Sequence, residues 1–150
     1  MSVGQFCNRD TAIARREDSV LDVARIMRQW HVGCLVIVEN DDRGVKPVGI
    51  ITDRDLVIEI LAANLNPDAV TVGDVLSSGL LTAREQDGLW ETLRRMQSRG
   101  VRRVPVVDAE GYLAGIITQD DLLEILVSEL SDLVKIPGRS RSEEHRYRGE

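Results

Sequence analysis

An eight-residue segment occurs twice in this chain, and this repeat constrains the fold more than any other feature. The first copy, GIITDRDL, covers residues 49–56, and the second, GIITQDDL, covers residues 115–122. Each copy passes from two isoleucines through threonine and two polar residues to an aspartate and a leucine. This order predicts a strand, a helix cap and a helix in succession. An internal repeat of this kind indicates two structural units with one plan.

In the first unit, the residues before the repeated segment predict a helix and a strand. Ser19 is a candidate N-cap. The residues after it place apolar side chains at i, i+3, i+4 and i+7, namely Val20, Val23, Ala24 and Met27. Gly33 is expected to end this helix. The apolar run 34–38 predicts a strand covered on both faces, and the turn residues 40–44 lead to a returning strand at 47–51.

The second unit follows the same order. A short first strand, predicted at 8–15 in the first unit, has its counterpart at 80–83. Asp87 is then the candidate cap of a helix that Gly100 closes, and strands are predicted at 101–107 and 113–117. The first halves of the units align 69 residues apart and the second halves 66 apart. We expect the three extra residues in the loop near residues 40–47, where insertions cost little.

The last helix keeps its apolar spacing beyond the length of its counterpart. Its apolar positions are Leu122, Ile125, Leu126, Leu130 and Leu133. Two interpretations are open: the extra turns pack on a partner subunit, or they cover the other repeat. We expect this helix to end near Ile136 and the polar residues 137–150 to be a disordered tail. The predicted division is therefore 1–66, 67–136 and 137–150.

Composition excludes several classes of function. The net charge of −6 and the aromatic content of 3% argue against a nucleic-acid partner. No run of 18 apolar residues is present, and the N-terminus does not resemble a signal peptide, so we expect a cytoplasmic protein without membrane contact. Two cysteines, Cys7 and Cys34, suit a reducing compartment. With His31 and His145 they do not have the spacing of a zinc site, so no metal is expected.

The candidate binding residues lie within the repeated segment. The Asp55 carboxylate can accept hydrogen bonds from both vicinal hydroxyls of a ribose, while the Thr52 hydroxyl and the first N–H groups of the helix suit a phosphate. Thr118 and Asp121 repeat this arrangement. A second interpretation is open, because a Thr-x-x-Asp sequence also forms a capping box that only stabilises the helix. The duplication does not decide between the two.

The two repeats resemble the CBS domain, named after cystathionine β-synthase. The resemblance covers roughly residues 5–133 and rests on the doubled G-[apolar]-[apolar]-T-x-x-D-[apolar] motif and on residues 101–108, which look like the family's strand before its turn. It implies an α+β fold of two β-α-β-β-α repeats packed with pseudo-twofold symmetry, with sheets face to face. It also implies two clefts, which in many members bind adenosine-containing ligands such as AMP, ATP or S-adenosylmethionine.

The resemblance also makes Arg102 the best phosphate candidate, since some adenylate-binding members have an arginine there that contacts phosphate. Its alternative role is that of a solvated arginine at a strand end. Arg54 of the first copy adds positive charge, but its counterpart is Asp120, which lies beside Asp121 and disfavours an anion. We therefore expect one tighter site and one weak or empty site.

Three functions can be compared at this point. The leading hypothesis is a non-catalytic sensor module that binds AMP, ADP, ATP, NAD or S-adenosylmethionine, requires no cofactor and regulates a separate protein. We expect it to form a homodimer through its repeats. The second is a structural dimerisation module with degenerate clefts. An enzyme is disfavoured, because the sequence contains no P-loop, G-x-S-x-G, H-E-x-x-H or G-x-G-x-x-G motif.

Overall fold

The structure, a computed structural model, describes residues 1–147, with the backbone alone described for 137–147. It contains two three-stranded sheets of the same topology. The strands of the first are β1 (Ile13–Ala14), β2 (Cys34–Asp41) and β3 (Gly44–Thr52), and those of the second are β4 (Ala83–Arg84), β5 (Arg103–Val107) and β6 (Leu113–Thr118). In each sheet the first strand pairs in parallel with the second, which forms an antiparallel hairpin with the third. The predicted α+β fold with two equivalent units is confirmed.

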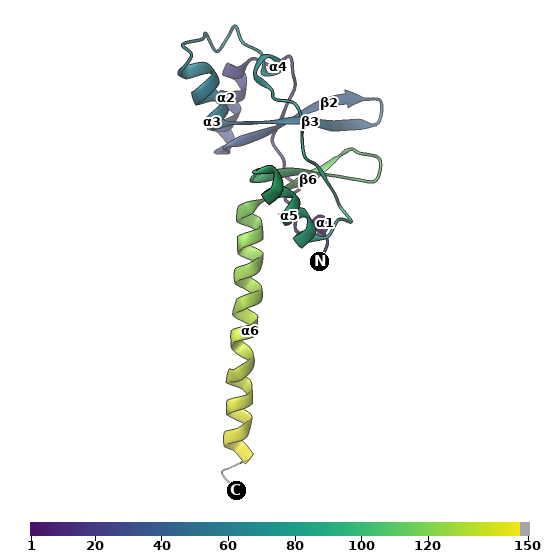
Figure 1. Ribbon diagram of the computed structural model, residues 1–150, viewed down its shortest axis with the longest axis vertical. Coiled ribbons are helices and arrows are strands. Elements are labelled where there is room, and N and C mark those ends of the chain that lie inside the picture. Colours follow the sequence, from purple (N-terminus) through teal and green to yellow (C-terminus); the bar gives the residue numbers. More distant parts are fainter. Residues whose placement is uncertain (148–150) are drawn as a thin grey trace.

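The two sheets lie face to face, as expected, and their outer faces are covered by helices (Figure 1). Apolar side chains from both sheets meet between them: Val36, Val38 and Ile116 are buried there, with Ile13, Cys34, Val45 and Leu113 packed around them. Helix α2 (Val20–Trp30) buries Val20, Val23 and Met27 in the core of the first unit. Helix α5 (Leu89–Arg99) buries Leu89 and Met96 in the core of the second.

Two short helices cross from one unit to the other. Helix α1 (Val3–Phe6) precedes the first unit in sequence, but Val3 is fully buried in the core of the second. Helix α4 (Val72–Val75) precedes the second unit, but Val72 is fully buried in the core of the first. Each unit therefore completes its core with a segment that the repeat pattern assigns to the other. The division at residue 66 stays a prediction about the repeats in the sequence. The two hydrophobic cores do not divide there, because each contains a helix from the other side of the division.

The helix ends differ in detail from the prediction. Ser19 is the N-cap of α2, since its hydroxyl accepts a hydrogen bond from Asp22 N. Helix α2 ends at Trp30, because His31 adopts the left-handed conformation with φ 52°, two residues before the glycine expected to end it. The N-cap of α5 is Gly88 and not Asp87. The Asp87 carboxylate instead accepts hydrogen bonds from Arg84 N and from the Arg95 guanidinium.

The strands also differ in length from the prediction. The first strands, β1 and β4, contain only two residues each, because only two residues of each segment pair in parallel with the neighbouring strand. The hairpin of β2 and β3 is longer than predicted and turns within residues 42–43. Asp41 stabilises that turn by accepting hydrogen bonds from the backbone N–H groups of Arg43 and Gly44. The extra residues of the first unit therefore lengthen its hairpin.

The helix after Thr52 has two parts. One α-helical turn, α3 (Asp53–Asp55), continues as a π-helix, η1 (Leu56–Leu61). The π-helix buries Ile60 in the core of the first unit. The apolar spacing predicted a helix here but not its wider winding.

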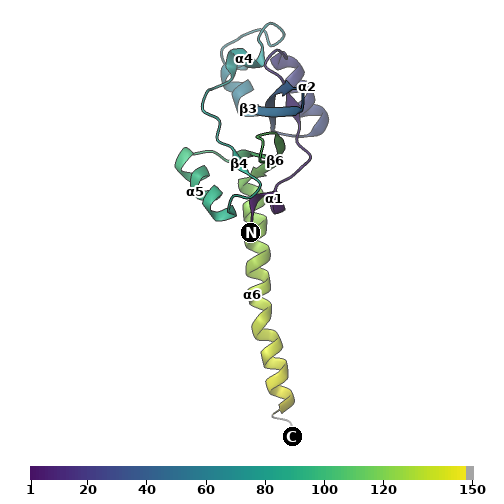
Figure 2. The same cartoon turned by 90° about the vertical axis from the view of Figure 1, so that its right-hand side faces the viewer.

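The C-terminal helix is longer than predicted. Helix α6 (Gln119–Tyr147) continues past Ile136, through residues expected to be a disordered tail, and stands away from the body of the molecule (Figures 1 and 2). Residues 139–147 contain neither glycine nor proline, so nothing in that sequence stops the helix once it has passed Pro137 and Gly138. Residues 148–150 lie outside the described residues. Because the helix projects outward, its extra turns do not cover the other repeat.

Candidate functional site

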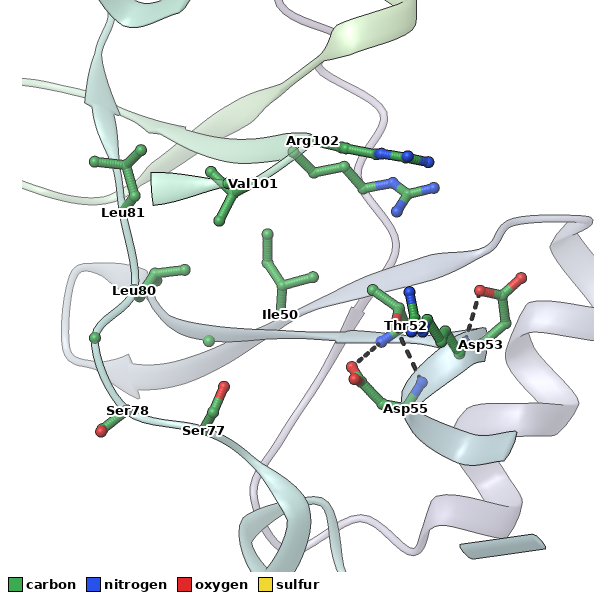
Figure 3. Close-up of a pocket in the computed structure, with 15 residues that line it drawn as sticks. Ile50, Thr52, Asp53, Asp55, Ser77, Ser78, Leu80, Leu81, Val101 and Arg102 are labelled. Atoms are coloured by element: carbon green, nitrogen blue, oxygen red, sulfur yellow. Dashed lines mark hydrogen bonds between the residues drawn. The ribbon is translucent and has the colours of Figure 1, made fainter. Parts of the chain in front are cut away.

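A pocket of about 660 Å³ lies between the two units. Three segments form it: the end of β3 with the start of the following helix, the linker after α4, and the residues that lead into β5 (Figure 3). The lining residues are Gly49, Ile50, Thr52, Asp53, Arg54, Asp55, Ser77, Ser78, Gly79, Leu80, Leu81, Gly100, Val101, Arg102 and Arg103. The pocket therefore brings together four of the predicted site residues, from both units.

Thr52 and Asp55 form the capping box that the sequence allowed. The Asp55 Oδ2 atom accepts a hydrogen bond from Thr52 N at 2.8 Å, and Thr52 Oγ1 accepts one from Asp55 N at 3.2 Å. Within the part of the chain that the structure describes, the other carboxylate oxygen, Oδ1, has no hydrogen bond. Figure 3 shows this carboxylate directed into the pocket. Capping therefore occupies one oxygen and leaves the other facing the hollow.

The two ends of the pocket differ in polarity. Ile50, Leu80 and Val101 gather at one end, whereas Thr52 and Asp55 lie at the other (Figure 3). The segment from Ser77 to Gly79 runs along one side between them and is exposed. A ligand with an apolar part and a polar part would match this distribution.

Three arginines bring positive charge to the polar end. Arg102 extends from the second unit toward the side of the pocket where Thr52 and Asp55 lie (Figure 3). Arg54 and Arg103 also line the pocket. Arg102 keeps an exposed side chain, and its backbone oxygen accepts a hydrogen bond from Gln119 N at 2.8 Å. The charge is suited to an anionic group at the pocket mouth.

Asp53 does not add its carboxylate to the pocket centre. Its Oδ1 atom accepts a hydrogen bond from Arg54 N, and the side chain turns away from the hollow (Figure 3). A Cβ atom at Gly33 would lie 3.2 Å from Asp53 Oδ2, so the two residues are close neighbours. Nearby, burial raises the pKa of the Cys34 thiol, the positive charge of Arg103 lowers it, and Asp53 raises it. Cys34 is therefore a neutral thiol at neutral pH.

The second copy of the motif is built alike but has different surroundings. Thr118 and Asp121 form the same reciprocal bonds, and the Thr118 hydroxyl also donates to Asp121 Oδ2 at 2.8 Å. Neither residue lines the pocket described above. Strand β6, which leads into Thr118, is bridged by the N-terminal segment: Asn8 and Ile116 exchange two backbone hydrogen bonds.

Arg9 holds the same segment in place. Its guanidinium donates to the backbone oxygens of Gly4 and Ala114 and pairs with Glu85 at 2.7 Å. These bonds attach the N-terminal segment to the residues that begin the second motif. Ser77 is the counterpart of Asn8 at the 69-residue spacing, and its segment lines the open pocket instead. The two motifs therefore differ in the segment that lies beside them, and the expected difference in affinity between the two sites stays a prediction.

The sequence did not identify the linker residues 77–81, or the apolar side chains of Ile50 and Val101, as part of the pocket lining. The linker contains no motif, so its place in the pocket follows only from the exchange of α4 between the units. One signal in the sequence could have found them. Residues 77–81 directly precede β4, and pseudo-twofold packing places the segment before β4 beside the Thr-x-x-Asp motif of the first repeat. Arg103, next to Arg102, was also not selected.

Other types of site find no support among the described residues. No group of three or more His, Cys, Asp or Glu side chains is arranged to hold a metal ion in that part of the chain. Similarly, none of the helices searched in the described chain is both long and apolar enough to cross a membrane.

Comparison with known proteins identifies both repeats. The model of the CBS domain family matches residues 3–62 and 72–128. An uncharacterised protein of Methanopyrus kandleri is 36% identical over 138 residues, which cover 90% of this chain and 69% of that protein. Hypoxic response protein 1 of Mycobacterium tuberculosis is 34% identical over 115 residues, which cover 77% of this chain and 78% of that protein.

Solved structures show the same fold. The crystal structure of Hypoxic Response Protein I, described with two coordinated zinc ions, matches with a TM-score of 0.72 at 31% identity, covering 83% of this chain and 98% of that one. The CBS domain pair of protein MJ0100, in complex with 5-methylthioadenosine and S-adenosylmethionine, matches with a TM-score of 0.73 at 26% identity. That match covers 86% of this chain and 98% of the other.

Proposed function

Because the chain belongs to the CBS domain family, we propose that it is a non-catalytic sensor whose pocket between the repeats binds an adenosine-containing ligand. The observation that carries the proposal is the Asp55 carboxylate, which caps its helix with one oxygen and directs the other into a pocket of about 660 Å³. A pocket of this size is within the range that small-molecule ligands occupy. The complex of the MJ0100 domain pair with two adenosine derivatives supports this class of ligand.

Each part of such a ligand has a counterpart in the pocket. Ile50, Leu80 and Val101 offer apolar surface for the adenine ring. Asp55 would accept hydrogen bonds from the ribose hydroxyls. Arg102 and Arg54, together with the Thr52 hydroxyl, would contact a phosphate or another anionic substituent. Among AMP, ADP, ATP, NAD and S-adenosylmethionine, the three lining arginines favour the phosphorylated ligands.

A regulatory role follows from the placement of the pocket. Its walls come from both repeats, so a ligand would contact both and could favour one relative arrangement of them. That change would act on a separate partner protein only if the partner binds the two arrangements with different affinity. Thr118 and Asp121 are proposed to form a weaker site or none, since Asp120 adds negative charge beside Asp121 and the N-terminal segment is bridged to Ile116, two residues before Thr118.

A thermal-shift panel tests the proposal. At a ligand concentration about 100 times Kd, binding to the folded state stabilises it by roughly 2.7 kcal/mol, so a clear rise in melting temperature is expected for one or more of the five ligands. If none of them shifts the transition at millimolar concentration, the pocket is not a nucleotide site. The alternative of a structural dimerisation module would then be favoured.

A further inference from the structure

The segments that follow the two exchanged helices begin alike. Cys7 after α1 and Leu76 after α4 occupy equivalent positions, 69 residues apart. Both have extended backbone, with φ −67° and ψ 145° at Cys7 and φ −69° and ψ 124° at Leu76. Each also donates its N–H at 2.9 Å to the carbonyl of the first residue of its helix. A difference between the segments that follow therefore needs a local cause.

In the second repeat, this segment lies directly on the edge of the sheet. Asn8 and Ile116 exchange two backbone hydrogen bonds, of 2.8 and 2.9 Å. The contact is close, because a Cβ atom at Gly115 would lie 2.6 Å from the Asn8 carbonyl oxygen. The outer edge of β6 at Ile116 is therefore filled by protein backbone.

In the first repeat, the equivalent edge of β3 is free. Val36 donates its N–H to Ala12 on the side of β1. The Val36–Ile50 pair of the β2–β3 hairpin is therefore not hydrogen-bonded, and the N–H and C=O of Ile50 point outward from the sheet. Within the described residues, no segment bridges Ile50 in the way that Asn8 bridges Ile116. Ser77, the counterpart of Asn8, is exposed instead.

The Leu76 side chain occupies the space over β3 that backbone fills over β6. The three atoms nearest to a Cβ at Gly49 all belong to the Leu76 side chain. At Gly115 the nearest atoms are Cys7 Sγ and the Asn8 carbonyl. Leucine is branched and larger than cysteine, so it leaves less room for the backbone that follows it. Leu76 is also held in this place, since it packs against the core of the first unit.

We propose that Leu76 is a positioning residue that keeps the first pocket open, because its side chain holds the linker residues 77–79 away from β3. Ser77 and Ile50 line the same hollow, so a bridge between them would fill part of it (Figure 3). Leu76 itself does not line the pocket. The position of the linker does not depend on a ligand, whereas the effect of Leu76 on ligand binding rests on the proposed function.

Arg9 is the competing cause of the difference between the segments. Its guanidinium bonds to Ala114 and Glu85, and its counterpart in the linker, Ser78, is too short to form such bonds. The Arg9 side chain is, however, 57% exposed. Ion pairs of exposed side chains contribute little to stability. We therefore assign the larger effect to the size of the residue at position 76.

Amide hydrogen exchange of the ligand-free full chain, followed by NMR, tests the position of the linker. In the wild type we expect the Ile50 amide to exchange at least about tenfold faster than the Ile116 amide, because only the second is hydrogen-bonded. Leu76→Cys should slow the exchange of Ile50 at least about tenfold, while Leu76→Met keeps the bulk of the side chain and should leave it unchanged. The amide of Ile51, which points toward β2, reports whether each variant is folded. Equal exchange of Ile50 and Ile116 in the wild type, or unchanged exchange of Ile50 in Leu76→Cys, overturns the proposal.

Cys7→Leu tests the same idea in the second repeat and does not depend on whether Leu76→Cys folds. We expect the larger side chain to displace Asn8 and to speed the exchange of the Ile116 amide at least about tenfold. Arg9→Ser introduces the residue found at position 78 and should leave the Ile116 amide protected. If Arg9→Ser exposes this amide and Cys7→Leu does not, Arg9 causes the difference and the role given to Leu76 is wrong.

Titration of the same variants with ATP measures the effect on the pocket. We expect Leu76→Cys to weaken binding at least about tenfold and Leu76→Met to leave it unchanged, since a closed fraction lowers the apparent affinity. Full affinity in Leu76→Cys despite a protected Ile50 amide would show that the linker does not control the pocket. A wild type that binds no ATP would contradict the proposed function, while the exchange of the Ile50 amide would still decide where the linker lies.

Discussion

Two glycines at equivalent positions allow a neighbouring segment to approach each sheet closely. A Cβ atom at Gly49 would overlap the end of the Leu76 side chain, which can rotate. A Cβ atom at Gly115 would lie 2.6 Å from the backbone oxygen of Asn8 and 2.9 Å from Cys7 Sγ. The backbone at Asn8 is held by two hydrogen bonds to Ile116 and cannot move aside without breaking them.

We therefore expect Gly115→Ala to cost about 2 kcal/mol of unfolding free energy and Gly49→Ala about 1 kcal/mol or less. Urea denaturation of both variants measures the difference. Equal losses, or a larger loss for Gly49→Ala, would mean that the N-terminal segment is not tightly fixed across β6.

Arg102 gives the second prediction for single residues. If it contacts phosphate, Arg102→Gln should weaken ATP binding about tenfold, which is about 1.4 kcal/mol, and leave the binding of adenosine nearly unchanged. Arg94→Gln removes the same charge from an exposed position on α5 outside the pocket and serves as the control. Equal losses of ATP affinity in the two variants would show that Arg102 acts only through the overall electrostatic field of the protein and not through contact with phosphate.

Single residues were predictable where a motif carried them. Thr52, Arg54, Asp55 and Arg102 were selected from the sequence and line one pocket. The linker serines and Leu80 were not, because a pocket wall made of irregular backbone leaves no periodic pattern in the sequence. The bridge at Asn8 was equally invisible, since it depends on which segments the fold brings together.

At the level of the elements, the helix caps of the two repeats share one pair of hydrogen bonds, and the second cap has one more. Thr52 accepts from Asp55 N, whereas Thr118 accepts from Asp121 N and also donates its hydroxyl to Asp121 Oδ2 at 2.8 Å. Loss of an N-cap side chain costs about 1 kcal/mol. A hydrogen bond to a charged group adds to that cost.

Thr118→Ala should therefore lower the unfolding free energy by about 2 kcal/mol and Thr52→Ala by about 1 kcal/mol. Guanidinium denaturation followed by far-UV circular dichroism gives both values. Thr→Ser at either position keeps the hydroxyl and controls for the loss of the cap. A larger loss at position 52 than at position 118 would contradict this account of the two caps.

Element types followed from hydrophobic period, while element ends depended on local contacts. The amphipathic spacing predicted α2 and α5, and the apolar runs predicted β2 and β5. The stop of α2 at His31 was not predicted, since a left-handed residue other than glycine is uncommon. Pro137 and Gly138 predict a shorter α6, whereas the helix continues through both to Tyr147.

At the level of the whole molecule, the exchange of α1 and α4 ties the two cores together. Val72 belongs to the second repeat by sequence but is buried in the first core, and Val3 shows the reverse. A unit of about 60 residues buries little surface alone, so each depends on the other for its core. We expect one cooperative unfolding transition for the full chain.

Trp90, which belongs to the second unit, provides the measurement. In a Trp30→Phe background its fluorescence reports the second unit alone, while Val72→Ala removes two buried methyl groups from the first core at a cost of about 2 kcal/mol. We expect Val72→Ala to lower the urea midpoint of the Trp90 transition. If the urea midpoint of the Trp90 fluorescence transition does not change in Val72→Ala, the two units unfold independently.

The repeated pattern was sufficient to predict the elements of both units, and the resemblance to the CBS domain predicted that their sheets lie face to face. The pattern could not predict which segments lie beside each motif, because these lie outside the repeat: residues 77–81 line the pocket at the first motif, whereas Asn8 and Arg9 bind the strand that leads into the second. The roles given to the site residues stay predictions.

Isothermal titration of the full chain with ATP and AMP tests the central claim, with Asp55→Asn and Asp121→Asn as a matched pair. An asparagine side-chain oxygen can keep the cap at either position, so both variants should stay folded. We predict one ligand per wild-type chain, a loss of affinity of at least about tenfold in Asp55→Asn, and little change in Asp121→Asn. Two equivalent sites per chain, or unchanged binding in Asp55→Asn, would contradict the account.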